Sequence, residues 1–124
     1  MVSSLNKVMV IGHVGRTPEM RYMPSGRAVT AFSVGTRRSW QDSAGDQREA
    51  TEWFNVVAWG ALAERCKSEL QKDDQVYVEG QLQTRSWKAD NGDVRFRAEL
   101  LAKEMLLLNR SPRPDAGSVR AVVD

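Results

Sequence analysis

The chain has 124 residues, the length of one domain, and can bury roughly two-thirds of its unfolded surface in a single core. Hydrophobic residues make up 41% of it and charged residues 27%, and no apolar run exceeds four residues, so we expect neither membrane insertion nor secretion. Cys66 is the only cysteine and His13 the only histidine, which excludes internal disulfides, cysteine-based zinc sites and most histidine-dependent catalytic sites.

The first half of the chain predicts three strands. Asn6–Val14 is rich in strand-forming residues and ends between two glycines. A turn-rich segment then leads to Arg27–Thr36, in which apolar and polar residues alternate. Ser39–Ala50 is polar and contains glycine, so it is predicted to be a long loop. Thr51–Trp59 alternates again and is predicted to be the third strand.

The second half predicts one helix and a hairpin. Leucine and cysteine recur every four positions in Ala61–Lys72 with charged residues on the other face, which indicates an amphipathic helix of about three turns. Two further strands, Gln75–Lys88 and Val94–Leu108, flank an Asp-Asn-Gly sequence, the strongest hairpin signal in the chain.

This order of elements is typical of one fold class. Five strands with a helix between the third and fourth predict an all-β, five-stranded Greek-key barrel of the oligonucleotide/oligosaccharide-binding (OB) type. We expect residues 1–110 to form this binding domain. Residues 111–124, which contain proline, glycine and serine, are expected to form a short flexible C-terminal tail.

Strand periodicity places large aromatic residues outside the barrel core. In the third strand Val56 and Ala58 share the apolar face, so Trp53 and Trp59 fall on the opposite face. On the fourth strand Trp87 falls outside, away from the residues expected to line the barrel. Each of these rings, taken alone, would be interpreted as a core or interface residue. Together they indicate an exposed interaction surface.

Basic residues accompany these rings. Trp40 lies in the predicted loop directly after Arg37 and Arg38, and Arg85 adjoins Trp87. Of the 18 basic residues, 13 are arginines, which bind phosphate bidentately and stack on flat rings. Every nucleobase has a flat face that can stack on an aromatic side chain. The combination predicts binding of single-stranded nucleic acid, because a duplex hides those faces.

No catalytic or metal-binding constellation is found in the sequence. Cys66 lies on the apolar stripe of the predicted helix, which favours a buried and inert thiol. His13, at the end of a strand, is interpreted as a surface or interface residue. The acidic residues of the predicted loop have no repeated ligand spacing. We therefore predict a protein that is not an enzyme and that uses no cofactor or metal.

The sequence resembles bacterial single-stranded DNA-binding proteins from Asn6 to Leu108. The resemblance rests on the segments Asn6-Lys7-Val8, Pro18-Glu19, Arg21-Tyr22, Thr51-Glu52-Trp53, Trp59-Gly60, Leu62-Ala63-Glu64, Val76–Leu82 and Thr84-Arg85. It implies sequence-tolerant binding and protection of single-stranded DNA in DNA replication, recombination and repair. It also implies a homotetramer of OB barrels in the bacterial cytoplasm, associated with the nucleoid.

The resemblance also implies which residues contact DNA. The predicted base-stacking residues are Trp40, Trp53, Trp59 and Trp87. Four basic residues match positions near the DNA path, namely Lys7, Arg21, Lys72 and Arg85. Three more are added as phosphate-binding residues because they adjoin tryptophans, namely Arg37, Arg38 and Lys88. The predicted loop Ser39–Ala50 is expected to close over the bound strand.

Some positions depart from the family pattern. Ala61, Gln83 and Ser86 stand where relatives often carry a basic residue, and Phe54 replaces a frequent histidine linked to tetramer contacts. The chain ends at Val122-Val123-Asp124 without an acidic tip, so recruitment of replication and repair proteins through the tail is not expected. The alternative function is that of a specialised OB-fold paralogue, either a primosome component or a single-stranded RNA binder.

Overall fold

The computed structural model describes residues 3–112. In this part of the chain the elements occur in the order β1 (Val8–Val14), β2 (Glu19–Tyr22), β3 (Ala28–Gln41), β4 (Gln47–Trp59), α1 (Ala61–Glu69), β5 (Gln75–Lys88) and β6 (Val94–Asn109). The strands are hydrogen-bonded in the order β1-β5-β6-β4-β3-β2, and β1 also pairs with β3. That last pairing closes β1, β5, β6, β4 and β3 into a barrel.

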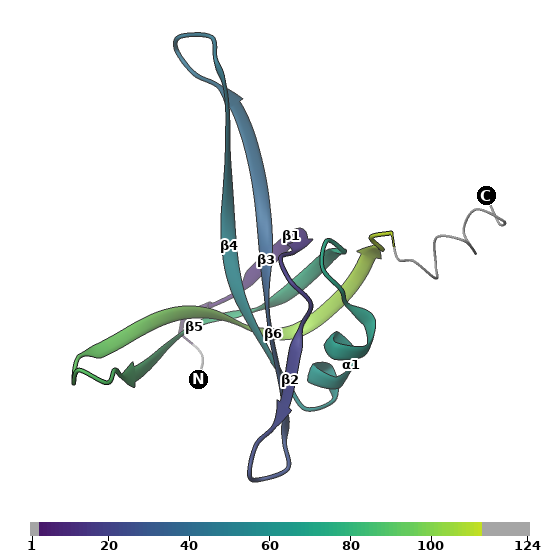
Figure 1. Ribbon diagram of the computed structural model, residues 1–124, viewed down its shortest axis with the longest axis vertical. Coiled ribbons are helices and arrows are strands. Elements are labelled where there is room, and N and C mark those ends of the chain that lie inside the picture. Colours follow the sequence, from purple (N-terminus) through teal and green to yellow (C-terminus); the bar gives the residue numbers. More distant parts are fainter. Residues whose placement is uncertain (1–2, 113–124) are drawn as a thin grey trace, which may run out of the picture.

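The predicted OB barrel is confirmed, with α1 between the third and fourth barrel strands (Figure 1). β4 and β6 run parallel through the pair Val56–Leu100, and the other paired strands are antiparallel. The short strand β2 lies in the segment that the sequence predicts to be rich in turns, and it extends the sheet at the edge of β3.

Valine is the most frequent residue of the barrel core, and the buried face of α1 packs against this core. Val56 and Ala58 of β4 are buried, which confirms the predicted inner face of this strand. Cys66 is also buried, as its helical spacing predicted. The hydroxyl of Thr30, itself fully buried, donates a 2.7 Å hydrogen bond to the carbonyl oxygen of Ala63 and so ties α1 to β3. No helix in the described residues has the length and apolar character that a membrane crossing requires.

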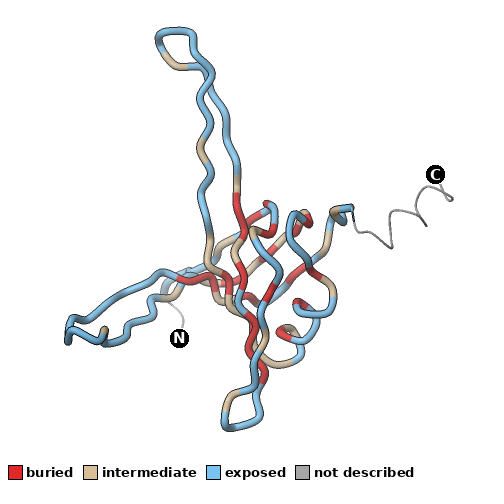
Figure 2. The backbone as a smooth tube through the Cα atoms, viewed as in Figure 1, coloured by how far each residue is buried: buried red, intermediate tan, exposed pale blue. Residues whose placement is uncertain are grey.

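Two hairpins project beyond the barrel as arms, and they are exposed along their length (Figures 1 and 2). In the β3–β4 arm, residues 36–52, cross-strand pairs continue from Thr36–Glu52 to Gln41–Gln47. The predicted long loop over Ser39–Ala50 is therefore wrong, because only residues 42–46 form the turn. Both faces of this arm lack a core to pack on, so its sequence is polar on both sides and shows no strand-like alternation.

The second arm, residues 81–98 of β5 and β6, leaves the barrel after Gly80. The backbones approach closely there: a Cβ on Gly80 would lie 1.9 Å from the carbonyl oxygen of Leu101. Beyond this point Leu82 is 50% exposed and Phe96 is 70% exposed. Apolar alternation continues along both strands where the barrel has ended, so these two side chains lie in solvent and not in the core.

Of the predicted tail, residues 111–124, all but the first two residues lie outside the described part. The backbone N–H of Ser111 donates a 2.7 Å hydrogen bond to Oδ1 of the buried Asp74. The described end of the chain is therefore fastened to the barrel beside the turn that follows α1.

Candidate nucleic-acid interface

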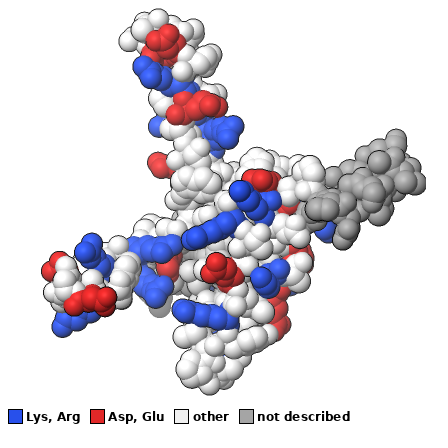
Figure 3. All heavy atoms as spheres, viewed as in Figure 1, with Lys and Arg blue, Asp and Glu red and all other residues white. Residues whose placement is uncertain are grey.

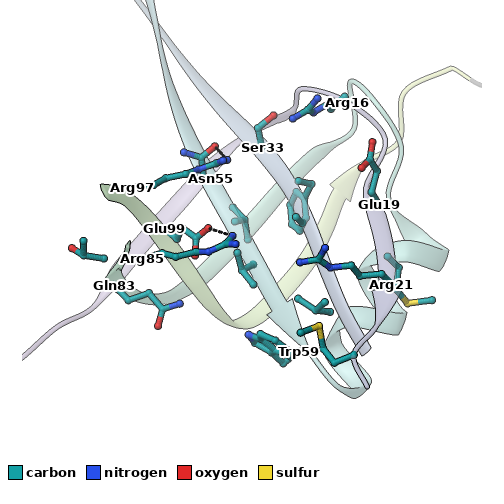
Figure 4. A pocket seen from close by; sticks show the side chains of 18 residues that line it. Arg16, Glu19, Arg21, Ser33, Asn55, Trp59, Gln83, Arg85, Arg97 and Glu99 are labelled. Carbon is teal, nitrogen blue, oxygen red and sulfur yellow. Dashed lines mark hydrogen bonds and ion pairs between the residues drawn. The ribbon is translucent and has the colours of Figure 1, made fainter. Parts of the chain in front are cut away.

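A groove of about 650 Å³ lies on the outer surface of the barrel, between β2, β3, β4 and the base of the β5–β6 arm (Figure 4). Its lining includes Asn55 and Trp59, which share the outward face of β4. Arg21 reaches it from β2 and Arg85 from β5. Three of the predicted DNA-contact residues, one tryptophan and two arginines, thus come together here.

A second hollow of about 460 Å³ lies beside Trp53. It also contains Arg37 from β3 and Lys72 from the turn after α1, two further predicted DNA-contact residues. Trp53 and Asn55 are two residues apart on the same face of β4, so the two hollows follow one another along this strand. We call this continuous outer surface, formed by the groove and the second hollow, the β4 face.

Two glycines create the space that Trp53 occupies. A Cβ on Gly15 would lie 2.6 Å from Cζ3 of Trp53, and one on Gly35 would lie 2.8 Å from the same atom. Both glycines are thus directly against the ring, and Gly35 is also its cross-strand partner. Trp53 nevertheless remains 58% exposed. The ring packs against the backbone of these two glycines, and much of its surface is exposed to solvent.

Guanidinium groups lie over three of the four tryptophans. The distance from Cζ to the ring centroid is 4.7 Å for Arg27 on Trp59, 4.6 Å for Arg38 on Trp40 and 5.8 Å for Arg85 on Trp87. Such contacts are weakly stabilising at exposed sites. They also hold beside each of these three rings a group that is able to bind phosphate.

The tryptophans on the two arms differ in which way they face. Trp87 lies on the same face of its arm as Arg85, which lines the groove. Trp40 lies opposite Arg48 on the β3–β4 arm, on the face away from Arg37 and its partner Thr51. Trp40 therefore belongs to a strand and not to a loop, and it does not face the same way as Trp53.

Three predicted basic residues lie away from the groove and the second hollow. Arg38 lies beside Trp40 on the far face of its arm. Lys88 lies on the face of the β5–β6 arm opposite its neighbour Trp87. Lys7 directly precedes β1, and its Nζ is 3.5 Å from Oε2 of Glu79 on β5.

Sequence reasoning missed several arginines of this surface. Arg16 and Arg97 line the groove, Arg95 is the cross-strand partner of Trp87, and Arg27 lies over Trp59. Figure 3 shows Lys and Arg side chains gathering across the barrel between the two arms. Arg95 and Arg97 alternate with apolar residues on β6, so strand periodicity was the signal that could have identified them.

Among the described residues, three titratable side chains of the barrel and its helix have pKa values shifted by burial or by hydrogen bonding. Burial raises the pKa of the Cys66 thiol to about 12, which keeps it protonated. The Tyr77 hydroxyl donates a 2.5 Å hydrogen bond to Glu79 Oε1, which raises the pKa of Tyr77 to about 12 and lowers the pKa of Glu79. Among residues 3–112, no three His, Cys, Asp or Glu side chains gather as a metal site would need.

Comparisons with known proteins agree with this architecture. The model of the single-strand binding protein family matches residues 5–108. Single-stranded DNA-binding protein 1 of Chlorobaculum tepidum is 46% identical over 109 residues, which cover 87% of this chain and 67% of that protein.

Two solved structures are also similar. The Plasmodium falciparum SSB in complex with ssDNA has a TM-score of 0.79 and 29% identity, over 88% of this chain and 99% of that one. A deletion mutant of the single-stranded DNA binding protein from Thermus aquaticus has a TM-score of 0.72 and 30% identity, over 85% of this chain and 51% of that one. With a family match across nearly all of the described residues, the chain belongs to the single-strand binding protein family.

Proposed function

We propose that this protein binds single-stranded DNA without reading its sequence and protects it during replication, recombination and repair. Bases stack on Trp40, Trp53, Trp59 and Trp87, and neighbouring Arg and Lys side chains bind the phosphates. The protein acts in the bacterial cytoplasm on the DNA of the nucleoid, through the binding unit formed by residues 1–110. Membership of a family of binding proteins makes it a DNA-binding protein and not an enzyme.

The observation that carries this proposal is the β4 face. Its two tryptophans lie on one side of one strand, and basic residues from β2, β3 and β5 surround them. Stacking of a base on an aromatic ring contributes roughly 1–3 kcal/mol and tolerates any sequence, because every base has a flat face. The surface therefore favours single strands, whose bases are free to stack, over duplexes.

A competition experiment tests the proposal. A fluorescently labelled oligothymidylate is bound to the protein, and unlabelled competitors are added at fixed moderate salt while anisotropy is measured. Unlabelled single-stranded DNA of mixed sequence should displace the probe, and a duplex of the same length should not. Equal displacement by the duplex would overturn the proposal. Stronger displacement by single-stranded RNA would favour the RNA-binding paralogue.

We further propose that the protein assembles as a homotetramer through an apolar patch on the outer surface of β1, β5 and β6. Register aligns Ile11, Tyr77 and Leu106 in one row across three strands, with Met9 nearby. Ile11 is 57% exposed and Leu106 is 54% exposed, which is unusual for aliphatic side chains so close together. Phe54 is not part of this patch, because it is half-buried and packs against the barrel core.

Sedimentation tests the assembly. The wild-type chain should sediment with the mass of four chains, and Ile11→Glu should shift it to smaller species. Phe96→Glu is the matched control, since it places the same charge on an exposed apolar residue of the β5–β6 arm. A wild-type monomer, or equal dissociation by both variants, would contradict assembly through this patch.

A further inference from the structure

The register of β5 and β6 brings two arginines opposite each other at the edge of the groove. Arg85 and Arg97 are Cα partners, and both line the groove. Figure 4 shows their side chains extending side by side toward β4. Like charges directly opposite each other on neighbouring strands repel. The free protein therefore holds an unfavourable pair of cations here, which a bound anion would relieve.

Two neighbouring side chains hold these arginines in place. Oδ1 of Asn55 on β4 accepts a 2.6 Å hydrogen bond from Nη2 of Arg97. Oε2 of Glu99, which is 5% exposed, lies 3.8 Å from Nη1 of Arg85. The amide of Asn55 carries no charge and Glu99 supplies one carboxylate for two guanidinium groups. The cluster therefore keeps a net positive charge.

The chemistry of this cluster fits a phosphodiester. A guanidinium group has five N–H donors in a planar fork that matches two phosphate oxygens. Within the described residues Arg97 donates one hydrogen bond, to Asn55, so its other N–H groups can serve a ligand. Trp59 lines the same groove and Trp87 follows Arg85 by two residues on the same face. A phosphate held here would lie near two aromatic rings on which bases can stack.

We propose that Arg85 and Arg97 together bind one backbone phosphate of single-stranded DNA as a two-arginine clamp. In this clamp Asn55 is a positioning residue for Arg97, and Glu99 is a positioning residue for Arg85. The inference rests on the proposed DNA binding and adds to it a subsite that includes Arg97, a residue the sequence did not single out.

Substitution of Arg97 by glutamine tests the clamp. Loss of one phosphate contact on a single strand lowers the slope of log K against log salt concentration by about 0.7, which corresponds to about fivefold weaker binding at about 0.1 M salt. Arg97→Gln should show both changes with a short oligothymidylate. Lys103→Gln removes one charge from an exposed position of β6 outside the groove and the second hollow, and it should leave the slope unchanged.

Two further variants separate the clamp from a structural role. Glu99→Gln keeps the shape of the side chain and removes the carboxylate that competes with phosphate for Arg85, so it should tighten binding and steepen the salt slope. A merely structural Glu99 would weaken binding when changed. Asn55→Ala should weaken binding less than Arg97→Gln, and it should add nothing when combined with Arg97→Gln.

The outcomes distinguish this proposal from the proposed function. If Arg97→Gln binds the oligothymidylate with wild-type affinity and wild-type salt slope, the clamp is wrong while DNA binding stands. If the wild-type protein does not bind the oligothymidylate, the proposed function itself fails.

Discussion

Trp87 is the tryptophan whose removal best separates DNA binding from folding. It lies on the β5–β6 arm, beyond the barrel core. Arg85 lies over its ring, and Arg95 is the cross-strand partner of Trp87. Loss of an exposed cation–π contact and a cross-strand pair destabilises a fold by about 1 kcal/mol. Loss of a stacked base costs about 1–3 kcal/mol of binding. That range corresponds to about fivefold to 150-fold in Kd.

Two substitutions, Trp87→Ala and Trp87→Phe, test this difference between the free energy lost from binding and the free energy lost from folding. Anisotropy of a labelled oligothymidylate gives Kd, and urea denaturation gives the free energy of unfolding. Trp87→Ala should lose more free energy of binding than of unfolding, and Trp87→Phe, which keeps a smaller ring, should recover most of the affinity. Stacking releases no counterions, so the salt slope should be the same in all three proteins.

Two results would refute this reasoning. Equal losses of binding and unfolding free energy in Trp87→Ala would show that the ring supports the arm and does not hold a base. Weaker binding accompanied by a smaller salt slope would show that the substitution acts through Arg85 and not through stacking.

Three further predictions follow from the packing and the charges. Gly35→Ala puts a Cβ 2.8 Å from the Trp53 ring and should weaken oligothymidylate binding by about fivefold or more. Unchanged affinity would show that the packing of the Trp53 ring on Gly35 is unimportant for binding. Gly80→Ala puts a Cβ 1.9 Å from a backbone oxygen of β6 and should lower the free energy of unfolding by about 3 kcal/mol. An unchanged midpoint of urea denaturation would contradict the close approach of the β5 and β6 backbones. The hydrogen bond from Tyr77 lowers the pKa of Glu79 in the folded protein. The bond therefore stabilises the fold at pH values above the pKa of an unfolded glutamate. This stabilisation is lost as the pH falls through the lower pKa that Glu79 has in the folded protein. Tyr77→Phe should therefore destabilise the protein more at about pH 7 than at about pH 3 by urea denaturation, and an equal effect at both pH values would argue against it.

Where a strand packs on the core, alternation in the sequence predicts its orientation. Val56 and Ala58 are buried and Trp53 is exposed, as the period of two requires. The apolar stripe of the helix likewise predicts that Cys66 and Leu70 are buried, and both are. In these segments one face packs on the core and the other faces solvent. Apolar and polar residues therefore alternate in the sequence with the period of the element.

Beyond the barrel that contrast disappears and the sequence misleads. The β3–β4 arm has solvent on both sides, so its sequence predicts a loop around Trp40 although this residue pairs with Arg48 in a regular ladder. The juxtaposition of Arg85 and Arg97 depends on the register of two strands, and that register shifts at an irregularity between Glu79 and Gly80. Cross-strand register is fixed by the whole barrel and is not encoded in either strand alone.

The central claim is that bases of single-stranded DNA stack on the exposed tryptophans, and intrinsic fluorescence tests it most directly. The protein is titrated with long poly-deoxythymidine at low and at moderate salt while tryptophan emission is recorded. Stacking of bases on the rings should produce strong quenching that saturates at a fixed ratio of nucleotides to protein. Unchanged emission from a protein that demonstrably binds the same DNA would contradict it, because the rings would then lie away from the bases.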